Sequence, residues 1–497
     1  MGIVFRQSIK YTIVSYLGVA IGTLSALFIY PQEEELYGLF QLFTQGAMFI
    51  MSIFLAGFSA HAIRFFPDFK DSDNKHNGFL AFLLLGAVAG FVLFLLFLPL
   101  LQHLILEVMF AGNPSIGVFS DYFLYIIPLV LFYMMNAILL RYISNFGRIV
   151  VPNLLNDLFI KISLPLFILA FSFSYISTED FIQLIVAMQL LILIGMLLYL
   201  KRLGQFSLKL NLKFIKPDLR KKIVEYSLFG LFSELGNRLV VTIDVIMVSA
   251  LISVELGGAY AIIRVISEVI GKPILAIQSI VSPMISQYWN ENNTDEIAKV
   301  YRKSSDTLLL ASTLLFFMIW NNIDDLFSIM PDSNSATLGK YVFLFLGISK
   351  IVDAATSVNS HIIGYSKYFR FNFYSLLILA GFNVVFNLVF IEQYHVIGAA
   401  IATFVSLFLF NLLKFGFIWR RFGFQPFNKN TLIILAIALS AYASTAFLPL
   451  DFHPIVNIVI RSVIMASIFL IASYRLKVSE EMNIFLDKYV MKYFRKG

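Results

Sequence analysis

Charge is scarce in this sequence, and cysteine is absent. Only 13% of the 497 residues are Asp, Glu, Lys or Arg, whereas 59% are hydrophobic. Without cysteine the chain cannot form disulfides, thiolate metal sites or a cysteine nucleophile. Long apolar runs also recur from one end to the other. The composition therefore excludes a soluble globular protein and indicates an all-α polytopic membrane protein.

Three other features of the sequence each exclude a common kind of site or function. The sequence has no GxxxxGK[ST] phosphate loop, so we expect no ATP site of that kind. No small-residue cleavage site follows the first apolar run, which we therefore expect to be kept as a membrane span. The net charge of +7 does not predict nucleic-acid binding, because the basic residues alternate with apolar runs and do not cluster on a soluble domain.

The apolar runs predict fourteen transmembrane helices, each of about 20 residues or more, which is enough to cross a hydrocarbon core of about 30 Å. We place these spans at residues 8–30, 39–62, 78–100, 120–141, 149–174, 180–200, 222–252, 257–286, 305–328, 338–364, 371–392, 395–418, 430–449 and 455–474.

Charge alternates between the connections of these spans. The odd-numbered connections, such as PQEEELYG and NNIDDLFSIMPDSNS, contain no Lys or Arg, whereas the even-numbered connections and the C-terminal tail are basic. The positive-inside rule then places both termini in the cytoplasm and the acidic connections outside.

The longest basic connection separates two sets of six spans and suggests an internal repeat. ELYGLF at 35–40 matches ELGGAY at 255–260, and both follow the first span of their half. We expect two pseudo-symmetric six-helix lobes with a cavity between them, plus two extra C-terminal helices. The predicted parts are an N-lobe (1–200), a basic cytoplasmic linker (201–221), a C-lobe (222–420), spans thirteen and fourteen (421–476) and a cytoplasmic tail (477–497).

Charged residues inside the seventh and eighth spans are the most informative feature. A charge at bilayer depth costs roughly 2.5–3.5 kcal/mol, so such residues face a protein interior or a wet cavity. Gly271 and Pro273 predict a break or bend beside them, although a simple packing kink is the alternative. The charged residues are Glu234, Arg238 and Asp244 in span seven and Arg264, Glu268 and Lys272 in span eight.

A purely structural interpretation stays open for most of these charges. Glu234 with Arg238, the Arg264–Glu268–Lys272 series, and Lys350 with Asp353 are each spaced to neutralise themselves on one helix. Arg64 lies at the cytoplasmic end of span two, where snorkelling explains an arginine. Asp244 has no partner at helical spacing, which favours an ion or proton site.

Residues 364–406, GYSKYFRFNFYSLLILAGFNVVFNLVFIEQYHVIGAAIATFVS, carry a family resemblance, with Asn383 and Asn387 four apart. Together with AGFSAHAIRFFPDF at 56–69, which contains Arg64, they resemble the polysaccharide transporter (O-antigen or lipid-linked oligosaccharide flippase) family. This family belongs to the multidrug/oligosaccharidyl-lipid/polysaccharide exporter superfamily. One departure is IYPQEEELYG at the exit of span one, which lacks the basic residue often found there.

The resemblance implies that the protein flips an undecaprenyl-diphosphate-linked oligosaccharide from the cytoplasmic to the outer leaflet of a bacterial inner membrane. The glycan would serve O-antigen, capsule or exopolysaccharide assembly. The implied partners are the lipid bilayer and the polymerase and glycosyltransferases of the same pathway. No cofactor is expected, and sodium or proton coupling is left open.

A diphosphate needs Arg or Lys partners, and Arg can bind it with two hydrogen bonds. The candidate substrate-binding residues are Arg64, Arg238, Arg264, Lys272 and Lys350, and the candidate coupling or ion-pair residues are Glu234, Asp244, Glu268 and Asp353. We expect no catalytic residue and no metal ligand.

Three alternative functions are considered. A cation-coupled multidrug exporter of the same fold would need an acidic and aromatic cavity, whereas here cations at least equal acids. A peptidoglycan-precursor flippase differs only in the headgroup, and the sequence does not separate it. A membrane glycosyltransferase or polymerase usually carries a large external loop, which this chain lacks, so we expect a secondary transporter and no enzyme.

Overall fold

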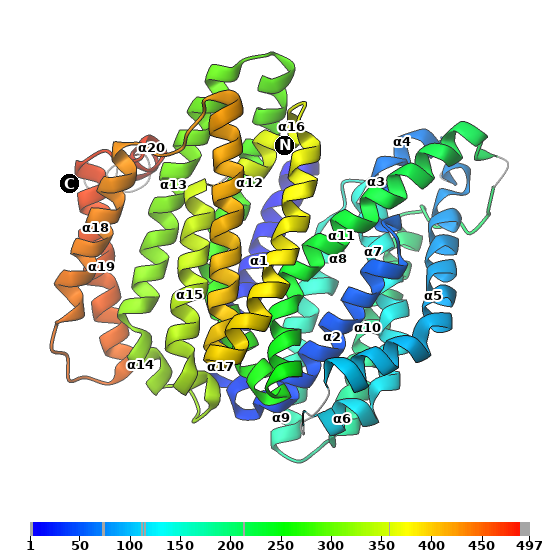
Figure 1. Cartoon of the computed structure of the whole chain (residues 1–497), viewed down its shortest axis with the longest axis horizontal. Helices are drawn as coiled ribbons and strands as arrows, with labels where there is room; N and C mark the ends of the chain where they lie inside the picture. The colour runs from blue at the N-terminus through cyan, green and yellow to red at the C-terminus, as the bar shows by residue number, and fades with distance from the viewer. Residues whose placement is uncertain are drawn as a thin grey trace. The chain divides into compact units, whose positions relative to one another are not determined.

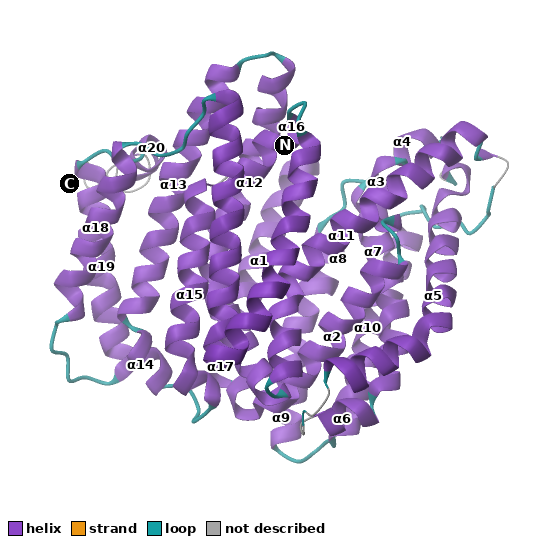
Figure 2. Cartoon of the chain, in the orientation of Figure 1, coloured by secondary structure: helices purple, strands orange, loops and turns teal. Residues whose placement is uncertain are grey.

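All regular secondary structure is helical in the part of the chain that its computed structural model describes, which comprises residues 3–71, 75–110, 113, 116–211, 214–356 and 358–487 (Figure 2). This confirms the predicted all-α class. The chain divides into two compact units, Met1–Ile262 and Ile263–Gly497. The predicted lobe boundaries stay a prediction, and residues 488–497 of the predicted tail lie outside the described residues.

The Met1–Ile262 unit holds the first half of the helices (Figure 1). They are α1 (Ile3–Phe28), η1 (Tyr30–Glu33), α2 (Glu34–Phe54), α3 (Phe58–Arg64), α4 (Phe66–Phe69), η2 (His76–Gly78), α5 (Phe79–His103), the π-helix η3 (Leu104–Met109), α6 (Ile116–Asp121), η4 (Phe123–Tyr125), α7 (Ile126–Ser144), α8 (Val150–Asn153), the π-helix η5 (Leu154–Leu158), α9 (Phe159–Ser172), α10 (Thr178–Arg202), α11 (Pro217–Leu251) and the first turns of α12 (Val254–Asn290).

The Ile263–Gly497 unit holds the rest of α12 and the helices that follow it. They are α13 (Thr294–Asn321), α14 (Ile323–Ser328), α15 (Asn334–Thr356), α16 (Asn359–Tyr365), α17 (Phe369–Phe422), α18 (Lys429–Ala446), α19 (Pro454–Arg475) and α20 (Glu480–Leu486) (Figure 1).

Membrane-spanning character follows from helix length and composition. Nine segments of the described residues are long and apolar enough to span a bilayer: Tyr30–Phe54, His76–Met109, Phe123–Ser144, Val150–Ser172, Thr178–Arg202, Asn334–Thr356, Phe369–Phe422, Lys429–Ala446 and Pro454–Arg475. The predicted multi-pass membrane protein is therefore confirmed, whereas the count of fourteen and the direction of the termini stay predictions.

One of these nine segments contains two predicted spans. A straight helix of 54 residues would be about 81 Å long, far more than a bilayer requires. His395 breaks α17 with φ 51° and ψ −131°. Gly398 lies close to the backbone of Phe390 on the other side of this break, where an added Cβ would come within 1.9 Å of the Phe390 carbonyl oxygen. The chain therefore reverses at His395, between the predicted spans 371–392 and 395–418.

In the Met1–Ile262 unit, α2 is the central helix. It packs against α7 and α11, and α7 also packs against α10. Most residues of α2 are buried, including Leu39 and Phe43. Large apolar side chains fill the space between these helices because close packing gives each of them many dispersion contacts.

Two predicted spans differ from the structure. Span two is interrupted at Ala56 and Gly57, which have φ values of 47° and 75°, so α2 and α3 are separate helices. Glycine is needed at position 57 because a Cβ there would lie 2.9 Å from backbone atoms of Gly230 in α11. In span eight, where a break or bend was predicted, the break is wrong because α12 continues through Gly271 and Pro273 as one helix, and the bend stays a prediction.

The segments around residues 35–40 and 255–260, which match in sequence, contact each other through backbone atoms at two glycines. A Cβ on Gly38 would lie 2.1 Å from the carbonyl oxygen of Val254, and one on Gly258 would lie 2.0 Å from that of Glu34. Gly258 follows Gly38 by 220 residues, and Val254 follows Glu34 by the same number. The contact is therefore reciprocal, which is the pattern that a two-fold relation between the segments would produce.

In the Ile263–Gly497 unit, α13 packs against different helices at its two ends. Its residues Leu309 and Leu310 pack with apolar residues of α18 and α19, including Ile434 and Phe469. At its other end Ile297 and Tyr301 pack with α12, α16 and α17. The two extra C-terminal helices are thus packed onto the helical core of this unit.

Ion pairs outside the predicted spans hold α20 against α13. Lys303 Nζ donates to Glu480 Oε2 at 2.6 Å and lies 3.6 Å from Glu481. The hydrogen bond to Glu480 and the charge of Glu481 raise the pKa of Lys303. Ser479 caps α20 by accepting a hydrogen bond from the Met482 amide.

The reciprocal glycine contact makes a testable prediction. Gly258→Ala should lower the free energy of unfolding by about 1–3 kcal/mol, since the clashing atom is backbone and cannot rotate away. Gly416→Ala is the matched control, because a Cβ there meets nothing within 4 Å in the described residues. Thermal melting in detergent is the measurement, and an unchanged melting temperature for Gly258→Ala would contradict the close contact.

Candidate functional site

A polar network crosses the interior of the Met1–Ile262 unit, and we call it the α11 cluster: Ser59, Tyr133, Gln189, Glu234 and Arg238. Ser59 Oγ donates to Glu234 Oε2 at 2.9 Å, and Gln189 Nε2 donates to the Tyr133 hydroxyl at 3.0 Å. Arg238 lies within electrostatic reach of both Glu234 and Tyr133. The break before α3 places Ser59 against α11, so the interruption of span two creates this contact.

Two further arginines lie on α7 and α3, helices that also supply Tyr133 and Ser59 of the α11 cluster. Arg141, at the end of α7, lies within electrostatic reach of Arg238 and repels it. The sequence analysis missed Arg141, because it stands in the basic connection RYISNFGR and was counted only toward orientation. Arg64 ends α3 and is exposed, with its guanidinium 6.0 Å from the Phe65 ring. Its exposure agrees equally with snorkelling and with substrate contact.

Asp244 lies farther along α11 and is buried, with 3% of its surface exposed. The hydroxyl of Tyr260 donates to its Oδ2 atom at 3.3 Å. A partner sixteen residues away, in α12, could not be found from helical spacing. Asp244 is therefore a buried carboxylate that accepts a hydrogen bond from a neighbouring helix of this unit.

A second network lies in the Ile263–Gly497 unit, and we call it the α12 cluster: Arg264, Glu268, Lys272 and Lys350. Lys350 Nζ, from α15, donates to Glu268 Oε1 of α12 at 3.0 Å. Arg264 and Lys272 stand one turn before and one turn after Glu268 and lie within electrostatic reach of its carboxylate. Three cations thus surround one carboxylate and leave an excess of two positive charges.

The α12 cluster differs from the arrangement that spacing suggested for Lys350. We considered a pair with Asp353 on the same helix, whereas the closest acid is Glu268 on the neighbouring helix. The side chains of Lys350 and Glu268 remain 24% and 42% exposed, so an arriving ligand can reach them. A partly exposed pair between two helices can also exchange partners more easily than a sealed one.

Asp353 connects the α12 cluster to a buried lysine that the sequence analysis missed. Lys414 of α17 is only 3% exposed, and Asp353 lies within electrostatic reach of both Lys350 and Lys414. Lys414 Nζ donates to Ser360 Oγ at 2.7 Å and lies 4.1 Å from the centre of the Phe410 ring. Lys414 begins the basic run KFGFIWRR, so charge patterning assigned it to the cytoplasmic side and not to the interior.

The chemistry available in the two clusters is electrostatic. Arg and Lys donate hydrogen bonds and attract anions, and the neighbouring carboxylates neutralise them when no anion is bound. Within the described residues no group of three His, Asp or Glu side chains is placed to hold a metal ion. The arrangement is suited to binding and releasing an anion.

Lys414 gives a prediction about stability. Removing one partner of a buried ion pair typically costs about 3–5 kcal/mol, whereas replacing both partners with apolar side chains is often neutral or stabilising. Because Asp353 lies within electrostatic reach of Lys414, Lys414→Met should lower the melting temperature, and the exposed Lys429→Met is the control. The double variant Asp353→Leu/Lys414→Met should recover most of the loss, and an unchanged melting temperature for Lys414→Met alone would contradict the pairing.

Comparison of the sequence with known proteins identifies the family of this chain. The model of the family described as "Polysaccharide biosynthesis protein" matches residues 7–289, and the MatE model matches residues 231–389. The probable low-salt glycan biosynthesis flippase Agl15 of Haloferax volcanii is 23% identical over 200 residues, which cover 40% of this chain and 42% of that protein. The match thus spans less than half the length of that relative.

Solved structures show the same fold. The lipid II flippase MurJ in an inward closed conformation has a TM-score of 0.74 at 15% identity, covering 94% of this chain and 98% of that one. An inward-facing multidrug resistance transporter of the MATE family has a TM-score of 0.65 at 12% identity, covering 82% and 94%. Because its family match spans more than half of the sequence, the chain belongs to the polysaccharide biosynthesis protein family of the multidrug/oligosaccharidyl-lipid/polysaccharide exporter superfamily.

Proposed function

We propose that the protein is a flippase that moves an undecaprenyl-diphosphate-linked oligosaccharide from the cytoplasmic to the outer leaflet. The observation that carries the proposal is the α12 cluster, where three cations share one carboxylate on membrane helices. The excess of two positive charges complements a diphosphate. Membership in the polysaccharide family supports a glycan as the cargo, as does the printed name of the archaeal relative.

The proposed mechanism is alternating access. Two lobes, 1–200 and 222–420, expose the cationic residues first to the cytoplasm and then to the outside. The diphosphate displaces Glu268 from Lys350 on binding, and Glu268 returns when the substrate leaves. The cations therefore stay partnered at every stage, which avoids the cost of leaving a buried charge alone. The polyprenyl tail stays in the lipid.

The proposed setting follows from the same chemistry. The protein works in the inner membrane of a bacterium with both termini in the cytoplasm, and it delivers glycan to the polymerase of its pathway. It is a secondary transporter and not an enzyme. Glu234, Asp244 and Asp353 are the candidates for sodium or proton coupling, because each is a carboxylate held inside a membrane helix bundle.

The rival function is a multidrug exporter, which the MatE match and the MATE fold bring into consideration. An organic cation arriving at the α12 cluster would meet three like charges and one carboxylate. Like charges at close range cost free energy, so this cluster disfavours a cationic drug. The peptidoglycan precursor shares the diphosphate and differs only in its headgroup.

The central prediction concerns the cations of α12. Arg264→Ala or Lys272→Ala should lower the rate of flipping at least tenfold, since a hydrogen bond to a charged group contributes about 1.5–3 kcal/mol. The measurement is the rate at which a polyprenyl-diphosphate-linked glycan in proteoliposomes becomes accessible to an impermeant glycosidase. Arg420→Ala, at the exposed end of α17, is the matched control.

A structural role for these charges is tested in the same assay. The double variant Glu268→Leu/Lys350→Met replaces the pair with apolar side chains, which should preserve folding. We expect it to insert normally and to lose flipping. Flipping at the wild-type rate in this variant or in both single variants would remove the α12 cluster from the substrate path.

Membrane potential gives an independent prediction. An inside-negative potential favours outward movement of an anion by about 2.3 kcal/mol per charge per 100 mV. Outward flipping should therefore accelerate with a potassium diffusion potential in liposomes of fixed ion composition. A monophosphate-linked glycan should respond about half as strongly, because it carries about half of the charge. Rates that do not change with potential would contradict the proposed movement of charge.

A further inference from the structure

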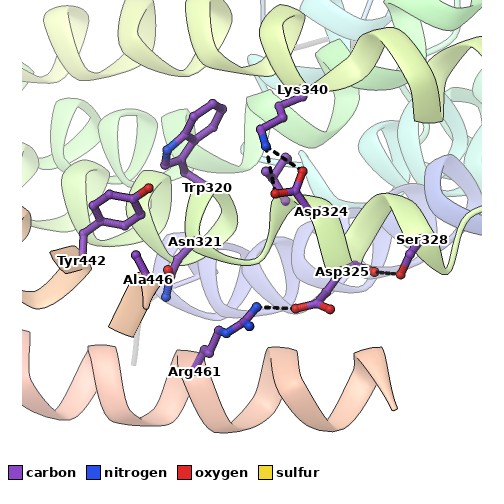
Figure 3. Close-up of a pocket in the computed structure, with 10 residues that line it drawn as sticks. Trp320, Asn321, Asp324, Asp325, Ser328, Lys340, Tyr442, Ala446 and Arg461 are labelled. Atoms are coloured by element: carbon purple, nitrogen blue, oxygen red, sulfur yellow. Dashed lines mark hydrogen bonds and ion pairs between the residues drawn. The ribbon is translucent and has the colours of Figure 1, made fainter. Parts of the chain in front are cut away.

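A second polar pocket lies in the Ile263–Gly497 unit and uses none of the residues of the α12 cluster. It is lined by α13, α14, α15, α18 and α19 and encloses about 390 Å³ (Figure 3). This volume is within the range of about 300–1,000 Å³ that is usual for small-molecule sites. The pocket is formed where the two extra C-terminal helices meet the rest of the unit.

Two ion pairs fix the polar side of this pocket. Lys340 Nζ lies 2.7 and 2.8 Å from the two carboxylate oxygens of Asp324, and Arg461 Nη1 lies 2.5 Å from Asp325 Oδ2. Figure 3 shows both pairs along the pocket. Asp325 and Arg461 are only 17% and 18% exposed, so their positions are held by the surrounding helices.

The charges in the pocket balance. Two carboxylates face two cations, so a charged ligand would be attracted by one member of each pair and repelled by the other. A ligand with many neutral groups that both donate and accept hydrogen bonds fits this pattern better, because carboxylates accept and Lys and Arg donate. Sugar hydroxyl groups have this property.

Two aromatic side chains provide an apolar wall. Trp320 of α13 and Tyr442 of α18 line the pocket on the side away from Ser328 (Figure 3). Lys340 Nζ lies 5.9 Å from the Trp320 ring centre. Aromatic rings with a polar edge suit ligands that have both an apolar and a polar face. A pyranose ring has an apolar C–H face and a rim of hydroxyl groups.

Two buried polar atoms of the lining also lack a protein partner. Asn321 Oδ1 and Arg461 Nε have no hydrogen bond within the described residues, although Asn321 Nδ2 donates to Thr445 Oγ1 at 2.9 Å. Buried polar groups normally have a partner from protein, ordered water or ligand. The lining residues thus hold one acceptor and one donor that no described residue satisfies.

The position of the pocket favours a ligand on the outer side. Its residues lie at the C-terminal ends of α13 and α18 and the first turns of α15, beside the connections NNIDDLFSIMPDSNS and LPLDFHP. Both connections lack Lys and Arg and are predicted to face outward. A site there would meet the glycan after translocation.

We propose that this pocket binds one sugar unit of the exported glycan at the outer face. The inference rests on the proposed flippase function. It assigns a role to α18 and α19, which supply Tyr442 and Arg461. Holding a sugar at the outer end would disfavour return of the glycan to the cytoplasmic leaflet.

The test uses Trp320 as its own reporter. The chain has three tryptophans, and Trp289→Phe/Trp419→Phe leaves Trp320 as the sole one. The probe is the oligosaccharide pool released by mild acid from the lipid-linked precursors of the source cell, added to the full-length protein in nanodiscs. We expect a saturable change in Trp320 emission.

Matched variants on one helix locate the binding. Ala446→Phe fills the pocket that Ala446 lines and should weaken the response at least tenfold, whereas Ala443→Phe, exposed on the same helix and outside the lining, should not. Tyr442→Ala should weaken it as well. Melting temperatures check that each variant is folded.

The outcomes separate this inference from the proposed function. No saturable response, or equal responses of Ala446→Phe and Ala443→Phe, would overturn the sugar site even if flipping proceeds. A response to diphosphate or glycerol phosphate in place of the sugars would reassign the pocket to a phosphate headgroup and overturn it too. Sugar binding without any flipping would leave the pocket supported and refute the flippase.

Discussion

A charge inside a membrane protein must meet another charge or a hydrogen-bonding group, and this requirement organises both units. The charged residues of α11 and α12 stand among apolar helices, where a charge without a partner is costly. Glu234 is held by Ser59, Asp244 by Tyr260 and Glu268 by Lys350. Each of these contacts joins two different helices. The same groups that make the spans costly therefore also fix how the helices pack.

Backbone geometry is adapted to these contacts. The left-handed residues Ala56 and Gly57 end α2 and start α3 close to α11, where Ser59 reaches Glu234. Close approach at Gly38 and Gly258 joins two segments that are also related in sequence. Small residues let membrane helices come near enough for short polar contacts to form. The close packing of the helices and the pairing of their charged side chains therefore depend on each other.

Much of this could be predicted from the sequence, and the limits have physical causes. Hydrophobic length predicted the helices well, including two spans on either side of His395, because the bilayer imposes a length that does not depend on tertiary contacts. Partners of charges were predicted less well. Helical spacing offered Asp353 for Lys350, and Asp353 does lie within its electrostatic reach, but the hydrogen-bonded partner is Glu268 on another helix. Spacing along one helix carries no information about which helices are neighbours.

Lys414 shows a second limit. Its place at the start of a basic run made it look like a cytoplasmic residue, yet it is buried beside Ser360 and Phe410. Composition rules describe the average position of a residue type and not the exception. Pro273 is the opposite case, since a helix breaker by type lies inside the continuous α12. In a membrane helix, neighbouring groups can compensate for a missing backbone donor.

The exchange of partners at Glu268 links stability to the proposed transport. A cation that is bound too tightly by its carboxylate would not release it to a diphosphate, and a cation without any partner would destabilise the helix pair. The Lys350–Glu268 pair avoids both extremes, because it is only partly buried and Arg264 and Lys272 compete for the same carboxylate. Competition of this kind lowers the cost of displacing Glu268, since its carboxylate stays near Arg264 and Lys272 and shares them with the diphosphate. An arrangement of three cations around one acid is therefore better suited to repeated binding and release than a simple ion pair.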